Sequence, residues 1–245
     1  MKLTRPRPAR RPRRTTGAAG LALVGLLLTG CGGSLGIHPG SAVVVGDRTL
    51  SMSRIDSTSR LFCDAFRPTI QQQAQGGAVP MGQLRQFVAA SLAERLIGQG
   101  LAAEYDVSPA AGYRQNQAQV QQQFATAPAD QLAALLDVEG GDPYLQNVQV
   151  AVGQQLTGNY GQADADLKAA QQRGVVATQD WLKDQTFAVD PSLGVILESG
   201  QVKASRDQTS YPLSALASAG AEQASSTSSA PASYLSSLSP SQLCG

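Results

Sequence analysis

The sequence predicts a mostly α-helical, multi-helix domain with a small β element built from an N-terminal hairpin and a late strand. The first observation is that apolar residues recur every four positions in residues 81–105, which is the spacing of one helix face. The second is that the same spacing returns in residues 142–157, with glycine and proline residues between the segments. The third is a run of valines before Gly46, which favours a strand and a turn.

The beginning of the predicted domain is a hairpin followed by a helix. Residues 43–50 (VVVGDRTL) favour two strands around a turn at Gly46. Ser51 or Ser53 is then expected to cap a helix. The apolar face of this helix holds Ile55, Ser59, Phe62 and Phe66. Pro68 is expected to end or kink it, because proline lacks the N–H of a helix hydrogen bond.

Residues 81–105 form the clearest predicted helix. Its apolar stripe holds Leu84, Val88, Leu92 and Leu96 and is widened by Phe87, Ile97 and Leu101, with Arg85, Gln86, Glu94 and Gln99 on the opposite face. Gly98 and Gly100 indicate a bend or a close crossing. A further helix is expected over residues 108–127, with a cap at Ser108. Three more are expected over residues 130–139, 142–157 and 163–185. Gly174 is a candidate interruption of the last of these. Residues 194–198 form the predicted late strand.

The composition changes near Gln208. Residues 208–245 contain twelve serines and one charged side chain, so this tail is expected to be partly disordered, with the more apolar end able to dock. The domain prediction is therefore a helical domain over 41–207 and a tail over 208–245. Cys63 and Cys244 form an even pair, which outside the cytoplasm favours a disulfide over the alternative of two unlinked thiols.

Residues 1–31 form a tripartite export signal. A basic stretch is followed by 12 apolar residues, 17–28, which are too few to span a bilayer. Leu28-Thr29-Gly30-Cys31 then resembles the lipobox of bacterial lipoproteins, in which the cysteine takes acyl chains such as palmitate. This predicts a signal peptide over 1–30, lipidation at Cys31 and a tether over 31–40. General secretion is favoured over twin-arginine export, and the domain is expected at the membrane on its extracytoplasmic side.

Charge and residue content argue against several classes of function. Seven of the 19 basic residues lie in the first 30 positions, so 12 basic residues face 18 acidic residues in the remainder. A nucleic-acid-binding protein is expected to keep a basic patch, so nucleic acid is not an expected partner. The single histidine, His38, lies in the predicted tether. We therefore expect no catalytic residues, no metal site and no cofactor; the acidic pairs 137/139 and 164/166 are interpreted as solvated charges.

Glutamine is unusually frequent in the third predicted helix. Gln115, Gln117, Gln119 and residues 121–123 occupy that helix, and residues 71–73 and 154–155 add more. Glutamine keeps helix propensity without a charge. Its amide could bond to a peptide backbone, although an exposed helix surface explains the same composition.

The order of these elements resembles the N-terminal chaperone module of SurA-like proteins, which is related to the substrate-holding domains of trigger factor and of lipid-anchored foldases. The strand pattern of that family is matched at Ala42, Val44, Gly46 and Leu50, and its long helix is similar to the segment from Leu96-Ile97 to Ser108. Residues 190–194 (DPSLG) are similar to its D-P-R-Y-G segment, except at Ser192 and Leu193. The resemblance covers roughly residues 41–200. Many members also carry a parvulin prolyl-isomerase domain, whose site commonly uses a pair of histidines. This chain has neither the inserted domain nor the histidine pair.

The resemblance implies a non-catalytic chaperone that binds unfolded or exported polypeptides. The amphipathic helices are expected to form an apolar groove for such chains, although no contact residue can be named from the sequence. The alternative is a structural or assembly lipoprotein that binds one dedicated partner in the cell envelope.

Overall fold

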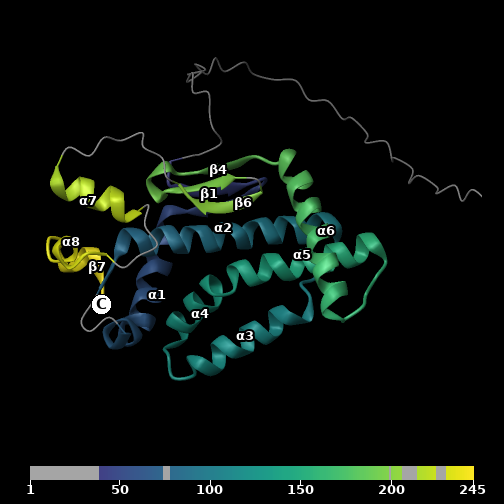
Figure 1. Ribbon diagram of the computed structural model, residues 1–245, viewed down its shortest axis with the longest axis horizontal. Helices are drawn as coiled ribbons and strands as arrows, with labels where there is room; N and C mark the ends of the chain where they lie inside the picture. Colours follow the sequence, from purple (N-terminus) through teal and green to yellow (C-terminus); the bar gives the residue numbers. More distant parts are fainter. Residues whose placement is uncertain (1–38, 74–77, 199, 206–213, 225–229) are drawn as a thin grey trace, which may run out of the picture. The chain divides into compact units, whose positions relative to one another are not determined.

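A long helix, α2 (Met81–Tyr105), contacts most other elements of the fold. The structure is a computed structural model that describes residues 39–73, 78–198, 200–205, 214–224 and 230–245, all within one compact unit. The strands within residues 41–51 and 187–204 lie on one side of α2, and the helices within residues 111–157 lie on the other (Figure 1). The described chain is mostly helical with a few short antiparallel strands, so the predicted fold class is confirmed.

Three antiparallel strands form the sheet beside α2, in the order β2-β1-β4. They are β1 (Ser41–Val45), β2 (Arg48–Ser51) and β4 (Phe187–Val189). The predicted hairpin is confirmed, and Gly46 turns it at a φ of 60°, which glycine adopts without steric cost. All five residues of β1 are buried, because β1 is the central strand and also contacts α2.

The strand that completes this sheet is not the one expected. The predicted late strand forms as β5 (Val195–Glu198), but it pairs with β6 (Gln201–Ala204) in a separate hairpin. The partner of β1 is β4, with Val44 opposite Ala188. The short 3₁₀ helix η1 (Pro191–Leu193) and Gly194, at a φ of 61°, turn the chain between β4 and β5. This turn ends the pairing with β1 before β5 begins.

Five further helices complete the helical part. They are α1 (Met52–Gln73), α3 (Ala111–Gln123), α4 (Ala129–Val138), α5 (Gly141–Thr157) and α6 (Asp164–Lys183). Of these, α1, α4 and α5 contact α2, α3 packs on α4 and α5, and α6 packs on α5. The predicted start of α3 at Ser108 was wrong, since the helix begins three residues later. Residues 107–110 instead form a connection in which the Ala110 N–H donates to the Asn147 carbonyl of α5.

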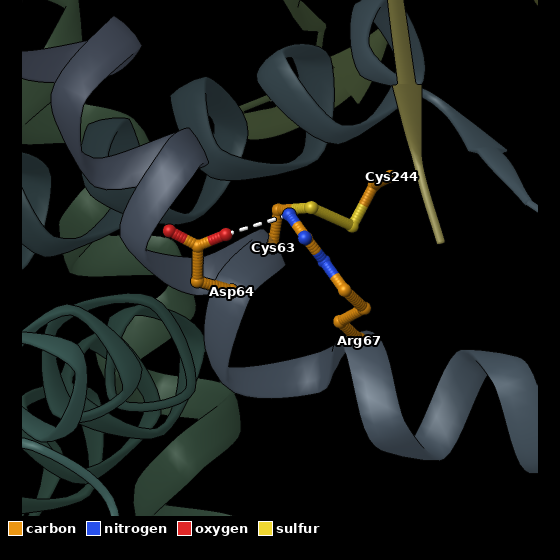
Figure 2. Close-up of a disulfide and its surroundings, with 4 residues drawn as sticks. All are labelled: Cys63, Asp64, Arg67 and Cys244. Atoms are coloured by element: carbon orange, nitrogen blue, oxygen red, sulfur yellow. Dashed lines mark hydrogen bonds and ion pairs between the residues drawn. A yellow bond between two sulfur atoms is a disulfide. The ribbon is translucent and has the colours of Figure 1, made fainter. Parts of the chain in front are cut away.

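Pro68 does not end α1. The Ser51 hydroxyl accepts a hydrogen bond from the Arg54 N–H at the start of the helix, as the sequence predicted. The helix then continues past Pro68 to Gln73. Its ribbon changes direction near Arg67 (Figure 2). A kink is the expected result where proline removes one backbone donor.

The predicted stripe of α2 is buried except at Phe87, which is 50% exposed. The expected polar face does not lie in solvent: its members Arg85, Gln86, Glu94 and Gln99 are all partly buried. The reason is that α2 has neighbours on several sides, including α1, α5 and the strands. In α5, Val148 and Val152 are buried as the spacing predicted, whereas Leu156 is exposed at the end of the helix.

Glycines allow the helices to cross at short distances. A Cβ atom at Gly174 of α6 would lie 1.9 Å from the Gln149 carbonyl oxygen of α5. One at Gly153 of α5 would lie 1.8 Å from the Ala170 carbonyl oxygen of α6. Gly174 therefore does not interrupt α6, but lets the two backbones touch.

The described part of the tail folds back on the domain. It comprises α7 (Ala215–Ala224), α8 (Ala232–Leu235), the 3₁₀ helix η2 (Pro240–Gln242) and β7 (Leu243–Cys244). Strand β7 pairs with β3 (Val79–Pro80), just before α2. Cys63 of α1 and Cys244 of β7 are joined in a disulfide with a Cα–Cα distance of 5.6 Å. The alternative of two unlinked thiols does not hold in this structure.

Candidate functional site

Four of the five phenylalanines of the chain gather where α1, α2 and the end of α3 meet. Phe62 and Phe66 lie one turn apart on α1, with ring centroids 4.6 Å apart. The Phe62 ring lies 5.9 Å from that of Phe87, and the Phe66 ring 5.2 Å from that of Phe124. We call these four residues the phenylalanine cluster. Their distances are those of favourable aromatic pairs.

The phenylalanine cluster passes from the core to the surface. Phe62 is buried, Phe66 and Phe124 are partly buried, and Phe87 is half exposed. Exposed glutamines 121–123 precede Phe124 at the end of α3. An apolar surface with uncharged amides beside it can contact apolar side chains and bond to a peptide backbone.

The disulfide lies next to this cluster, because Cys63 follows Phe62 on α1. Figure 2 shows the bond from Cys63 to Cys244, with the ion pair of Asp64 and Arg67 beside it. Arg67 Nη2 lies 2.7 Å from Asp64 Oδ1, and both side chains are about half exposed. The sulfur atoms join the apolar core, since Cys63 and Cys244 are 3% and 0% exposed.

A cleft of about 470 Å³ lies between the start of α2 and the C-terminal segment. Its apolar lining comes from Pro80 and Met81 on one side and Tyr234 and Leu238 on the other. The polar lining comes from Gln83, Arg85, Ser241 and Gln242. Gln83 lies one helical turn before Phe87, so the cleft and the exposed ring share a face of α2.

A polar cluster joins α1, α2 and α4 elsewhere in the fold. The Asp137 carboxylate pairs with Arg54 of α1 and, at 3.2 Å, with Arg95 of α2. Because two arginines pair with its carboxylate oxygens, we interpret Asp137 as a link between helices and not as a metal ligand.

Glu94 of α2 is the most perturbed acid among the described residues. Burial and, to a smaller extent, the nearby Asp142 carboxylate together raise its pKa to about 7. Burial also raises the pKa of Glu139. Neither acid lies in the phenylalanine cluster or lines the cleft.

The other residues that the sequence singled out are dispersed or outside the described ranges. Cys31, His38 and the predicted signal peptide lie outside them. Asp166 accepts a hydrogen bond from Asn159 Nδ2 at 3.0 Å. The described residues contain no group of three or more potential metal-binding side chains, and no helix among them is long and apolar enough to cross a membrane.

Periodicity alone does not predict the phenylalanine cluster, although the sequence carries one signal of it. Phe62 and Phe66 were placed on one helix face, and Phe87 on an apolar stripe. The grouping depends on how three helices pack, which periodicity does not reveal. The concentration of phenylalanine in these segments was the available sign.

Comparison with known proteins does not place the chain in a group. No protein-family model, no curated protein and no solved structure matches it.

Proposed function

We propose that this protein is a membrane-anchored extracytoplasmic lipoprotein that binds unfolded or exported polypeptides without catalysis. In this proposal, acyl chains on Cys31 hold the domain at the membrane. The phenylalanine cluster provides the contact surface. The resemblance to SurA-like chaperone modules agrees with this function.

The supporting observation is the partly exposed group of aromatic rings at Phe66, Phe87 and Phe124. Aromatic rings that rest on a buried neighbour lose little side-chain entropy on binding, and they bury large apolar areas. The expected wide groove of helix faces does not contribute, because the stripes of α2 and most of α5 are buried in the core. The proposed surface is therefore smaller than the sequence suggested.

The first test replaces the exposed ring. The soluble chain that starts at Gly32 keeps both disulfide cysteines, and we expect it to suppress aggregation of a reduced, unfolded model protein. Phe87→Ser should weaken this suppression by about fivefold, because one aromatic contact contributes on the order of 1 kcal/mol.

The matched control is Ile196→Ser in β5. Ile196 is 41% exposed, so it tests the loss of an exposed apolar side chain outside the phenylalanine cluster. We expect this variant to behave like the unchanged chain. Equal loss in both variants, or no suppression by the unchanged chain at several-fold excess, would contradict the proposal.

A second measurement tests the alternative of one dedicated envelope partner. Cross-linking in cells followed by pull-down should capture many exported polypeptides if the protein is a chaperone. A single stoichiometric partner would favour the assembly lipoprotein instead.

A further inference from the structure

The last residues of the chain form a strap across the start of α2. We use the name C-terminal strap for residues 230–245, which include α8, η2 and β7. Strand β7 contacts α1 and β3, and η2 contacts α2. The strap therefore bridges the same two helices, α1 and α2, that carry Phe62 and Phe87.

The strap covers apolar surface beside the phenylalanine cluster. Cys244 belongs to the same buried core as Phe62, Cys63 and Leu84. Tyr234 and Leu238 of the strap form one wall of the 470 Å³ cleft, whose other wall precedes Phe87 on α2. Removal of the strap would open the cleft and extend the exposed apolar surface from Phe87 toward the start of α2.

Among the described residues, short contacts with β3, α1 and the start of α2 hold the strap. Its ladder with β3 consists of two residue pairs, Val79 with Cys244 and Pro80 with Leu243. Pro80 has no N–H to donate to that ladder. Within 230–245 only Cys244 is buried. The bond to Cys63 adds a covalent attachment of this segment to α1.

We propose that the strap occupies part of the polypeptide-binding surface and that the Cys63–Cys244 disulfide controls its release. This inference rests on the proposed function. Strand β7 of the strap pairs in an extended form with β3 and carries an apolar side chain, Leu243. An extended client segment would pair with the edge of β3 in the same way. Oxidised protein then exposes only the outer part of the apolar surface, and reduced protein exposes more of it.

Release needs a dithiol as the reductant. One thiolate of the dithiol attacks a sulfur of the disulfide, and the other cysteine leaves as a thiolate that takes up a proton. The second thiol of the reductant then attacks the mixed disulfide. This step frees the second cysteine as a thiol and leaves the reductant as a disulfide, so two electrons and two protons pass to the protein. Because both cysteines are buried, the strap must first open locally.

The experiment compares the chain from Gly32 to Gly245 in three forms: oxidised, reduced with dithiothreitol, and with Cys244→Ser. Hydrogen exchange reports on the strap and on α2 and α5 separately. Binding is measured with a reduced, carboxymethylated model protein, which has no thiols to exchange. Reduction and Cys244→Ser should speed exchange in residues 232–244, leave α2 and α5 protected, and tighten binding about fivefold. Cys63→Ala, which keeps the core apolar, should match them.

Three results would overturn the proposal. Unchanged exchange in the strap after reduction would mean that other contacts hold it. A freed strap without tighter binding would mean that it covers no binding surface. Faster exchange throughout α2 and α5 would mean that the disulfide holds the whole domain and not the strap. None of these results depends on Phe87→Ser, which tests the proposed function in the oxidised protein.

Discussion

At the scale of single residues, Glu94 is the acid among the described residues whose pKa is raised furthest. Its carboxyl group lies partly buried on α2, near Asp142 at the start of α5. Burial, followed by repulsion from Asp142, raises its pKa from 4.5 to about 7. An acid whose pKa is higher in the folded state binds more protons when folded, so folding is favoured while the group is protonated.

We therefore expect stability to fall as the pH rises from about 4.5 to about 7. Glu94→Gln removes the charge, and it should flatten most of this slope and stabilise the protein at pH 8 by about 1–2 kcal/mol. Burial also raises the pKa of Glu139, so part of the dependence of stability on pH should remain in this variant. Urea unfolding at several pH values measures the effect.

Glu104→Gln is the matched control, since Glu104 lies exposed near the end of the same helix. It should leave the pH dependence of the unchanged chain intact. A Glu94→Gln variant with the same slope as the unchanged protein would refute the assignment of this dependence to Glu94.

At the scale of elements, the pair α5 and α6 shows how glycine sets a helix crossing. Gly153 and Gly174 lie where the two backbones approach most closely, and any side chain at either position would overlap a carbonyl group. The exposed position Gly82 in α2 is different, because a Cβ atom there would meet nothing within 4 Å.

Alanine substitutions should separate these two roles. Gly174→Ala should destabilise the protein by about 2–3 kcal/mol, because the helices must move apart. Gly82→Ala should be neutral or stabilise it by about 0.4–1 kcal/mol, because alanine lowers the conformational entropy of the unfolded chain. Thermal and urea unfolding measure both. Equal effects would show that chain entropy, and not the crossing, governs Gly174.

Local patterns predicted the elements better than their partners. The spacing of Leu84, Val88 and Leu92 was enough to predict α2, because one helix face is a local property. The pairing of β1 with β4 was missed, since a three-residue strand such as Phe187–Val189 has too short a pattern to recognise. The phenylalanine cluster was missed for a related reason: its members lie up to 62 positions apart, and only tertiary packing unites them.

At the scale of the whole molecule, the proposed membrane location, but not the binding surface, depends on an acyl anchor at Cys31, outside the described residues. The signal before Cys31 predicts this anchor, and two acyl chains would hold a protein far more firmly than one. The membrane location and the polypeptide-binding surface are thus separable parts of the proposal.

Replacing Cys31 tests the anchor alone. Cys31→Ser should move the protein from the membrane fraction to the soluble extracytoplasmic fraction and prevent labelling with a palmitate analogue. The purified domain should keep its activity against aggregation, as Phe87 is unchanged. A Cys31→Ser protein that stays in the membrane fraction would contradict lipid anchoring at this residue.

The central position of β1 has a consequence for the order of folding. Val43 and Val44 pair on one side with β2, which follows within a few residues, but on the other side with β4, roughly 145 positions later. Because a pairing between such distant segments forms slowly, that edge of β1 stays open until β4 joins the sheet. Until then the folding chain exposes a row of valines whose backbone amides have no strand partner, a state prone to self-association. A protein that we propose to protect other emerging chains thus passes through the same hazard itself.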